Sequence, residues 1–193
     1  KVIHTTAWDD SFDPTGNRIA LIGTGATAVQ LIPQLARNAG ELTVYQRTAI
    51  HVVPKLDFAY PEWTKRLFTR IPAAQRVVRA VTDAIYEFFN YVVLHQGQFL
   101  YRRLDIGGAD VAKLYRFITV RDPELRRKLT PPYDLGCKRP TFSNSYYRTF
   151  TKPHVHLQSS GIEHIEPHAF VFNDTATTEI YTLVLATGFD LWE

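Results

Sequence analysis

The sequence contains no methionine and a single cysteine, Cys137, among its 193 residues. One cysteine excludes an internal disulfide framework and a cysteine-based zinc site, and this scarcity is typical of proteins in a reducing cytosol, so we predict a cytoplasmic location. The sequence does not start with methionine, and its opening KVIHTTAW lacks the features of a signal peptide. We therefore expect this chain to be an internal piece of a longer protein.

Long apolar runs and a strong net charge are also absent. The longest candidate run, EFFNYVVLHQGQFLYRRL, is interrupted by Asn90, His95 and Gln96, which predicts no membrane span. The net charge is only +3 and the basic residues are dispersed, which fits a small anionic ligand better than nucleic acid. His154 and His156 alternate on a strand-like run without a carboxylate or cysteine at ligand spacing, so we predict no metal site.

The pattern of residues 18–60 predicts a strand, a helix and a second strand. RIALIG is short, β-branched and apolar throughout, as in a strand buried on both faces of a parallel sheet. The apolar residues that follow Ala26 recur at helical spacing, with Pro33 expected to kink the helix and Gly40 to stop it. ELTVYQR then supplies the second strand, completing a βαβ unit of an α/β fold.

The rest of the chain divides by composition. Residues 61–130 are rich in helix formers with apolar residues three and four apart, and we interpret them as a helical insertion. Residues 131–182 begin as a loop dense in proline, glycine and aromatics, which leads to a short strand at VHLQ and further strand-like pieces. Residues 1–17 form a linker closed by a DPTGN turn. Residues 183–193 contain the end of a buried strand, TLVL, and the glycine turn after it.

A glycine-rich turn separates the first strand from the helix. It matches the dinucleotide fingerprint G-x-G-x-x-G/A through Gly23, Thr24, Gly25, Ala26, Thr27 and Ala28. The first glycine permits the tight turn, the second lets a pyrophosphate approach the backbone, and the small third residue lets helix and strand pack closely. The helix N-terminus favours the anion, although a purely structural turn is the alternative.

Arg47 stands just past the second strand, where NAD-binding units place an acid. An acid there accepts hydrogen bonds from the ribose 2′-hydroxyl, whereas an arginine attracts a 2′-phosphate. Arg47 therefore predicts NADPH over NADH, with Thr48 as a further hydrogen-bond donor. The alternative is a solvated arginine at the end of a strand.

Several motifs together resemble the Baeyer-Villiger monooxygenases, a family of flavoproteins. HTTAWD resembles the end of their fingerprint F-x-G-x-x-x-H-x-x-x-W-[P/D], with His4 and Trp8 as its histidine and tryptophan. GTGATAVQ (ending at Gln30), QRT, GCKRPTFSNSYY and LVLATGFD follow in the family's order. The segment 173–182, NDTATTEIYT, instead resembles one reading frame of a sequencing adapter, which suggests an assembly artefact, and its Tyr181 replaces an acid that the family often has there. The resemblance implies a Rossmann-like NADPH-binding domain with a helical insertion, part of a flavoprotein with two dinucleotide-binding domains.

The resemblance also implies roles for residues later in the chain. Lys138 matches a lysine that helps Arg47 bind the 2′-phosphate, and Arg139 matches the catalytic arginine beside the flavin, although an exposed basic pair is the alternative. A planar, permanently charged guanidinium suits the stabilisation of an oxyanion. Ala186, Thr187 and Gly188 match the turn at which the chain re-enters the FAD domain, which is missing here.

The implied activity is an FAD- and NADPH-dependent insertion of one oxygen atom of O2 next to a ketone carbonyl, giving an ester or lactone. The piece alone is expected to be inactive. Two alternatives remain open at this point: an N- or S-oxygenating flavin monooxygenase, and a non-catalytic NADP-binding module. HTTAWD argues against the first of these, and Arg139 in a ligand-lining loop argues against the second.

Overall fold

The protein is described here by a computed structural model that covers most of the chain. The described residues are 1–55, 59–94, 108–135, 137–138, 140–166, 169–172, 177–179 and 181–188. The helices are α1 (Ala26–Asn38), α2 (Glu62–Arg70), α3 (Pro72–Leu94), α5 (Gly108–Thr119), α6 (Pro123–Lys128) and α7 (Tyr146–Thr149). The strands are β1 (Val2–His4), β2 (Arg18–Ile22), β3 (Glu41–Tyr45), β4 (Val52–Val53), β5 (Thr141–Phe142), β6 (Val155–Gln158), β7 (Ile162–Glu166), β8 (Ala169–Phe172), β9 (Thr177–Glu179) and β10 (Thr182–Leu185).

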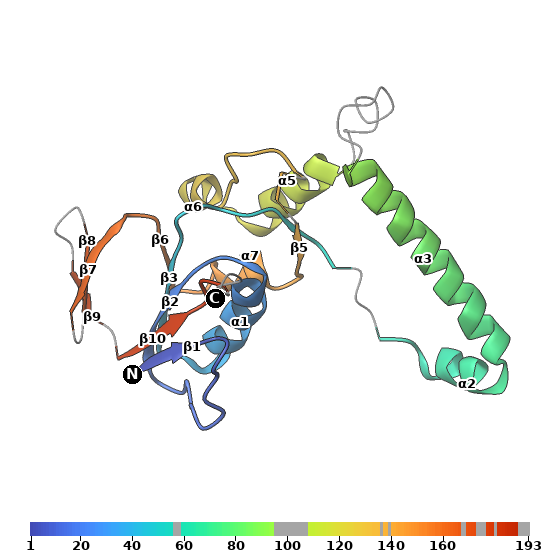
Figure 1. The fold of residues 1–193 in the computed structure, drawn as a ribbon, viewed down its shortest axis with the longest axis horizontal. Helices are drawn as coiled ribbons and strands as arrows, with labels where there is room; N and C mark the ends of the chain where they lie inside the picture. Colours follow the sequence, from blue (N-terminus) through green and yellow to red (C-terminus); the bar gives the residue numbers. More distant parts are fainter. Residues whose placement is uncertain are drawn as a thin grey trace, which may run out of the picture.

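A five-stranded parallel sheet forms the centre of the fold, in the order β1-β10-β2-β3-β6 (Figure 1). The predicted βαβ unit is confirmed as β2, α1 and β3, and the predicted strands at VHLQ and TLVL are confirmed as β6 and β10. Alternate residues of β2 pack on opposite faces, with Ile19 and Leu21 in the main core and Ala20 in a smaller cluster with Leu183. The strand is therefore buried on both faces, as its apolar run predicts.

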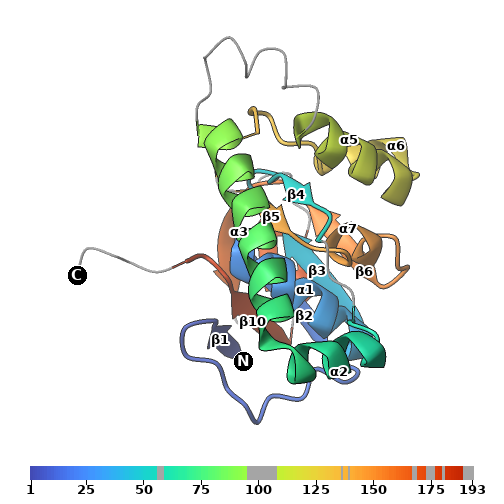
Figure 2. The ribbon, with the colours of Figure 1, turned by 90° about the vertical axis from the view of Figure 1, so that its right-hand side faces the viewer.

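Helix α1 covers one face of this sheet and packs against β3 and α7 (Figure 2). Its buried side is apolar, with Val29 and Ile32 inaccessible to solvent. The helix continues through the buried Pro33 to Asn38, as expected, and the kink expected at Pro33 stays a prediction. Packing of the apolar side against the sheet accounts for this, since tertiary burial compensates for the one backbone hydrogen bond that proline removes.

The helix ends just before Gly40, as predicted, but not through a left-handed glycine. Ala39 caps it with φ −58° and ψ 140°, so no glycine in a left-handed conformation is involved. Gly40 instead lies against the turn at residues 14–17, where an added Cβ would be 2.6 Å from the carbonyl oxygen of Gly16. The Gly16 N–H in turn donates to the carbonyl of Asn38 at 3.0 Å. The predicted turn therefore exists, and close approach to it is what makes glycine necessary at position 40.

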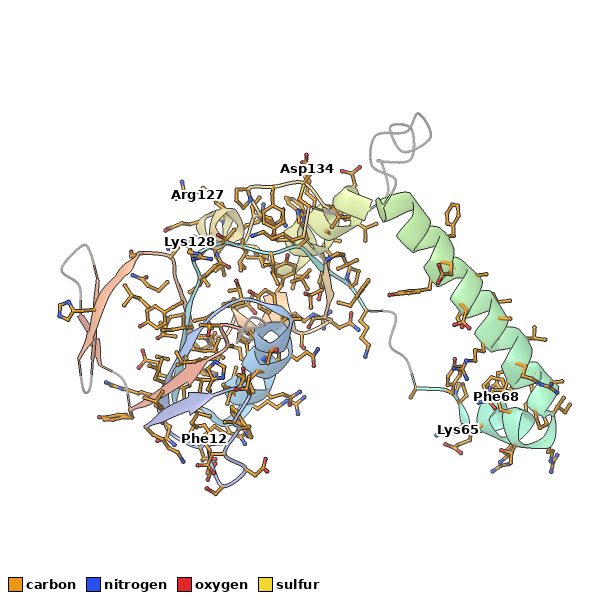
Figure 3. The ribbon with its side chains drawn as sticks, viewed as in Figure 1. Phe12, Lys65, Phe68, Arg127, Lys128 and Asp134 are labelled. Atoms are coloured by element: carbon orange, nitrogen blue, oxygen red, sulfur yellow. The ribbon has the colours of Figure 1, made fainter. Side chains whose placement is uncertain are left out.

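The described part of residues 61–130 is largely helical, in agreement with its periodicity, while residues 95–107 lie outside the described ranges. Helices α2 and α3 pack on each other and stand apart from the sheet (Figures 1 and 3), with Lys65 and Phe68 on α2 far from Phe12 near the sheet. Their exposed apolar side chains include Trp63 and Ile85, which are 68% and 63% exposed. None of the described helices combines the length and apolar character needed to cross a bilayer.

Two smaller sheets complete the structure. Strands β4 and β5 form a parallel pair, and β7, β8 and β9 form an antiparallel sheet beside the large one (Figure 1). The β4–β5 pair matters for the site described next, because it joins the segment after β3 to the loop that precedes β5. The boundaries expected between a linker, a βαβ unit, a helical insertion and later segments stay predictions.

Candidate functional site

A cleft of about 600 Å³ lies at the carboxyl edge of the parallel sheet. Strand β2 has β3, which follows it through α1, as its neighbour on one side, and β10 as its neighbour on the other side. Ligands of open α/β sheets bind at such a reversal of strand order, outside the carboxyl ends of the strands. The cleft is lined by Ile22, Gly23, Thr24, Gly25, Ala26, Thr27, Tyr45, Arg47, Thr48, Ile50, Lys138, Ala186, Thr187 and Gly188.

Gly23 begins the turn at the floor of this cleft. Its φ is +118°, a conformation that L side chains rarely adopt. A Cβ at this position would lie 2.3 Å from the carbonyl oxygen of Ala186, which follows β10. The Gly23 N–H donates to the carbonyl of Tyr45 at 3.1 Å, and the Ala186 N–H donates to the carbonyl of Ile22 at 2.9 Å. Glycine is therefore required here by the fold itself, because three strand ends meet at this position.

Gly25 has a different environment. It precedes α1 with φ −68° and ψ −176°, an ordinary extended conformation, and a Cβ added there would meet no protein atom within 4 Å. No side chain caps the helix, and its first turn contains no acidic residue. The protein alone does not demand glycine at this position, whereas an anion approaching the exposed N–H groups of the helix would.

The other end of the cleft is cationic. Arg47 and Lys138 both line it and both are exposed, and among the described residues neither forms an ion pair. The described lining contains no Asp or Glu. The Thr24 hydroxyl donates to the carbonyl of Thr48 at 3.0 Å, which ties the glycine turn to the segment that carries Arg47. The result is one connected surface with positive charge at one end and free backbone donors at the other.

Most of the site residues expected from the sequence gather in this cleft. Ala28 and Gln30 do not line it: Ala28 is fully buried on the sheet side of α1, as close packing of the third motif position requires, and Gln30 is exposed. Arg139, the expected catalytic residue, lies outside the described residues, so its role stays a prediction.

Three lining residues were missed by the sequence reasoning: Ile22, Tyr45 and Ile50. Ile22 and Tyr45 are the last residues of β2 and β3. The rule that ligands bind at the carboxyl ends of parallel strands would have singled out both of them. Ile50 has no comparable signal, because its position depends on the path of the chain after Arg47.

The expected fingerprint residues lie at the same edge of the sheet. His4 ends β1 and pairs in register with Leu185, the last residue of β10. Its Nδ1 is 2.6 Å from the hydroxyl of Thr6, and the next N–H, that of Thr5, donates to the carbonyl of Leu185 at 3.0 Å. Trp8 is 36% exposed and packs edge-on against Phe12. These contacts place the segment beside the turn that begins at Ala186.

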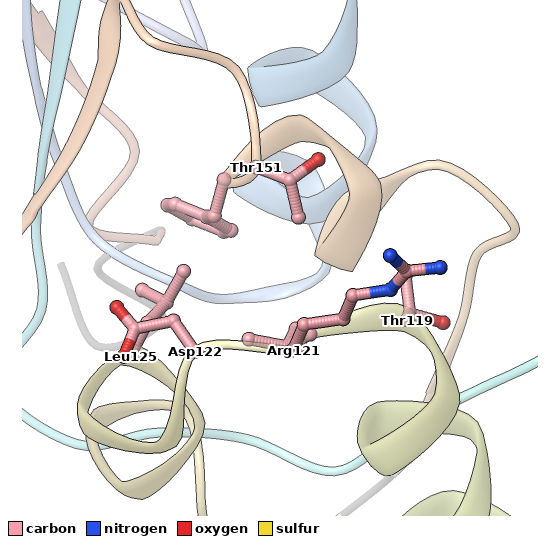
Figure 4. Close-up of a pocket in the computed structure, with 7 residues that line it drawn as sticks. Thr119, Arg121, Asp122, Leu125 and Thr151 are labelled. Atoms are coloured by element: carbon pink, nitrogen blue, oxygen red, sulfur yellow. The ribbon is translucent and has the colours of Figure 1, made fainter.

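A second cavity, of about 400 Å³, lies between the α5–α6 connection and α7 (Figure 4). Figure 4 shows Thr151 across it from Asp122 and Leu125. The Asp122 carboxylate accepts the backbone N–H of Glu124 at 2.9 Å, so it already caps α6. Within the described part of the chain, no group of three or more His, Cys, Asp or Glu side chains gathers in a way that could hold a metal.

Comparison with known proteins adds independent evidence. No protein-family model matches the chain. A Baeyer-Villiger monooxygenase of Streptomyces coelicolor is 34% identical over 190 residues, which are 98% of this chain and 36% of that protein. Crystal structures of cyclohexanone monooxygenase from Rhodococcus sp. Phi1 bound to NADP+ and of OTEMO in complex with FAD and NADP are 27% and 26% identical, with TM-scores of 0.74 and 0.73. Each covers 98% of this chain, which spans 41% and 42% of those chains.

The chain thus spans somewhat over a third of the length of the curated relative it matches, and almost all of the chain is matched. The likeness in sequence and the likeness in fold point to the same group of proteins, and each covers 98% of this chain. Nearly the whole of this chain thus matches one part of a Baeyer-Villiger monooxygenase, in sequence and in fold.

Proposed function

We propose that the cleft binds NADPH and that the chain serves as the NADPH-binding region of an FAD-dependent Baeyer-Villiger monooxygenase. The observation that carries this proposal is the composition of the cleft: a glycine turn at a helix N-terminus and two cations, Arg47 and Lys138, with no acid in the described lining. The NADP+ in the related cyclohexanone monooxygenase and the FAD and NADP in OTEMO support the same assignment.

The described residues fit NADPH at both of its distinctive anionic groups. The open space at Gly25 and the uncapped start of α1 suit the pyrophosphate, because N–H groups and the helix dipole both favour an anion there. The guanidinium of Arg47 and the ammonium of Lys138 suit the 2′-phosphate, with Arg47 able to donate two parallel hydrogen bonds. An NADH-specific site would place an acid in this position, where it would repel the phosphate.

In the whole enzyme, NADPH would supply the hydride that reduces FAD. One oxygen atom of O2 would be inserted beside a ketone carbonyl to give an ester or lactone, and the other would leave as water. The residues of this chain bind and orient the coenzyme. Gly23 sets the shape of the turn, Gly25 leaves room for the pyrophosphate, and Arg47 and Lys138 select the phosphorylated ribose. For Arg139, we propose stabilisation of negative charge that develops during oxygen insertion.

Calorimetric titration with NADP+ and with NAD+ tests the binding part of the proposal. We expect NADP+ to bind at least about tenfold more tightly, since charge-assisted hydrogen bonds contribute roughly 1.5–3 kcal/mol. Equal affinities would contradict the assignment. Ketone-dependent NADPH consumption by the full native enzyme tests the reaction: NADP+ binding without ketone oxidation would indicate a non-catalytic NADP-binding module or a different oxygenation.

A further inference from the structure

The ammonium of Lys138 is placed by an aromatic ring. Its Nζ lies 4.9 Å from the centroid of the Tyr133 ring, within the range of a cation–π interaction. Among the described residues, no carboxylate pairs with this lysine. A lysine side chain has four rotatable bonds and loses considerable freedom when it is fixed, so a contact that restricts it before a ligand arrives reduces the cost of binding.

Tyr133 is itself fixed by His51. The His51 Nε2 lies 2.8 Å from the carbonyl oxygen of Tyr133, and because a carbonyl only accepts, Nε2 carries the proton. The two rings also pack edge to face, with centroids 5.4 Å apart and an interplanar angle of 81°. Burial raises the pKa of the Tyr133 phenol, so the ring is neutral in ordinary buffers.

His51 belongs to the segment that carries Arg47. Its carbonyl accepts the N–H of Thr141 at 3.0 Å, and Val52 pairs with Thr141 in the β4–β5 pair. The loop with Tyr133 and Lys138 is therefore attached on both sides to the chain that follows Arg47. Two cations from segments about 90 residues apart in sequence reach one cleft through this connection.

We propose that Tyr133, held by His51, is a positioning residue that presents Lys138 to the 2′-phosphate and so contributes to the preference for NADPH over NADH. This inference rests on the proposed function of the cleft. An aromatic partner suits the task better than a carboxylate would. The ring attracts the ammonium without adding a negative charge, so it neither neutralises the lysine nor repels the incoming phosphate.

The test compares Tyr133→Leu with Tyr133→Phe in the full native chain, with dissociation constants for NADP+ and NAD+ measured by calorimetry. Tyr133→Leu removes the ring, and we expect NADP+ to bind about three- to tenfold more weakly while NAD+ affinity is unchanged. Tyr133→Phe keeps the ring and should restore NADP+ affinity to within about twofold of wild type. Tyr86→Leu, at an exposed tyrosine of α3, is the matched control and should change neither constant.

A double mutant separates positioning from a general structural role. If Tyr133 acts through Lys138, then adding Tyr133→Leu to Lys138→Ala should cause no further loss of NADP+ affinity. Additive losses, equal losses for NADP+ and NAD+, or no loss would each overturn the inference. If the wild type itself fails to prefer NADP+, the proposed function fails and this inference fails with it. If the wild type and Lys138→Ala behave as proposed but Tyr133→Leu does not, only the role of Tyr133 is overturned.

Discussion

The two ends of the cleft differ in the groups that they offer to a ligand: one offers backbone and the other offers side chains. The glycine end uses backbone: Gly25 leaves empty space, and the first turn of α1 offers N–H groups. The cationic end uses long side chains, Arg47 and Lys138, which come from two segments joined by the β4–β5 pair. A backbone site is shared by all dinucleotides because all carry a pyrophosphate, whereas the side-chain site can distinguish one dinucleotide from another. Binding and selectivity should therefore be separable by mutation.

Gly23→Ala should have the largest effect, and it should act on stability. The added Cβ would lie 2.3 Å from the Ala186 carbonyl oxygen, at a φ of +118° that alanine rarely adopts. Backbone strain and overpacking together should lower the free energy of unfolding by about 3–5 kcal/mol. Urea unfolding measures this change. Gly25→Ala is the matched control, with its Cβ in open space, and a similar loss there would show that the two glycines do not differ as described.

Gly25→Val should affect binding and leave the fold intact. A Cβ there meets no protein atom within 4 Å, and a branched side chain would occupy the space through which a pyrophosphate approaches the backbone. We expect NADP+ and NAD+ to lose affinity together, by about a hundredfold or more, while the free energy of unfolding changes by less than about 1 kcal/mol. Calorimetry and urea unfolding on the same preparation measure both quantities. Unchanged affinity would mean that the turn is only structural.

Arg47→Ala should affect NADP+ far more than NAD+. Removing the guanidinium takes away charge-assisted hydrogen bonds to a group that only NADP+ carries, at a cost of roughly 1.5–3 kcal/mol, or about a tenfold to hundredfold rise in Kd. Arg37→Ala, at an exposed arginine in the last turn of α1, is the control and should change neither affinity. Equal losses for both coenzymes after Arg47→Ala would remove the distinction between the two ends of the cleft.

Thr24→Val should have the smallest effect, because it weakens the link between the two ends. The change keeps the shape of the side chain but removes the hydroxyl that donates to the Thr48 carbonyl at 3.0 Å. We expect a loss of about 1 kcal/mol in the free energy of unfolding and a modest loss of NADP+ affinity, about two- to fivefold. Thr24→Ser retains the donor and should preserve both. A wild-type NADP+ affinity in Thr24→Val would show that the ends act independently.

Local features of this site were accessible from the sequence. The βαβ unit follows from apolar runs and a 3.6-residue period, and the positions of Gly23, Gly25 and Arg47 follow from their spacing within that unit. Each of these inferences concerns residues that are close together along the chain, where pattern and propensity apply directly.

Long-range features were not accessible. The carbonyl that makes Gly23 indispensable belongs to Ala186, and the ring that holds Lys138 is fixed by His51. Neither contact has a periodic signal, since each depends on how separate segments meet in space. The exposed apolar side of α3 shows the same limit: periodicity predicts that the helix has such a side, but it does not say what the side packs against.

The position of β10 in the sheet has a consequence for how the chain acquires its fold during synthesis. This strand lies between β1 and β2, yet it begins 160 residues after β2 ends at Ile22 (182 − 22 = 160). At about 5–20 residues per second, a ribosome takes roughly 8–32 seconds to make the intervening chain. Throughout that time, one edge of β2 and the partner edge of β1 lack their native neighbour. The nascent βαβ unit must therefore persist with an open edge, and contacts of such long sequence separation make the closing step slow and exposed to mispairing.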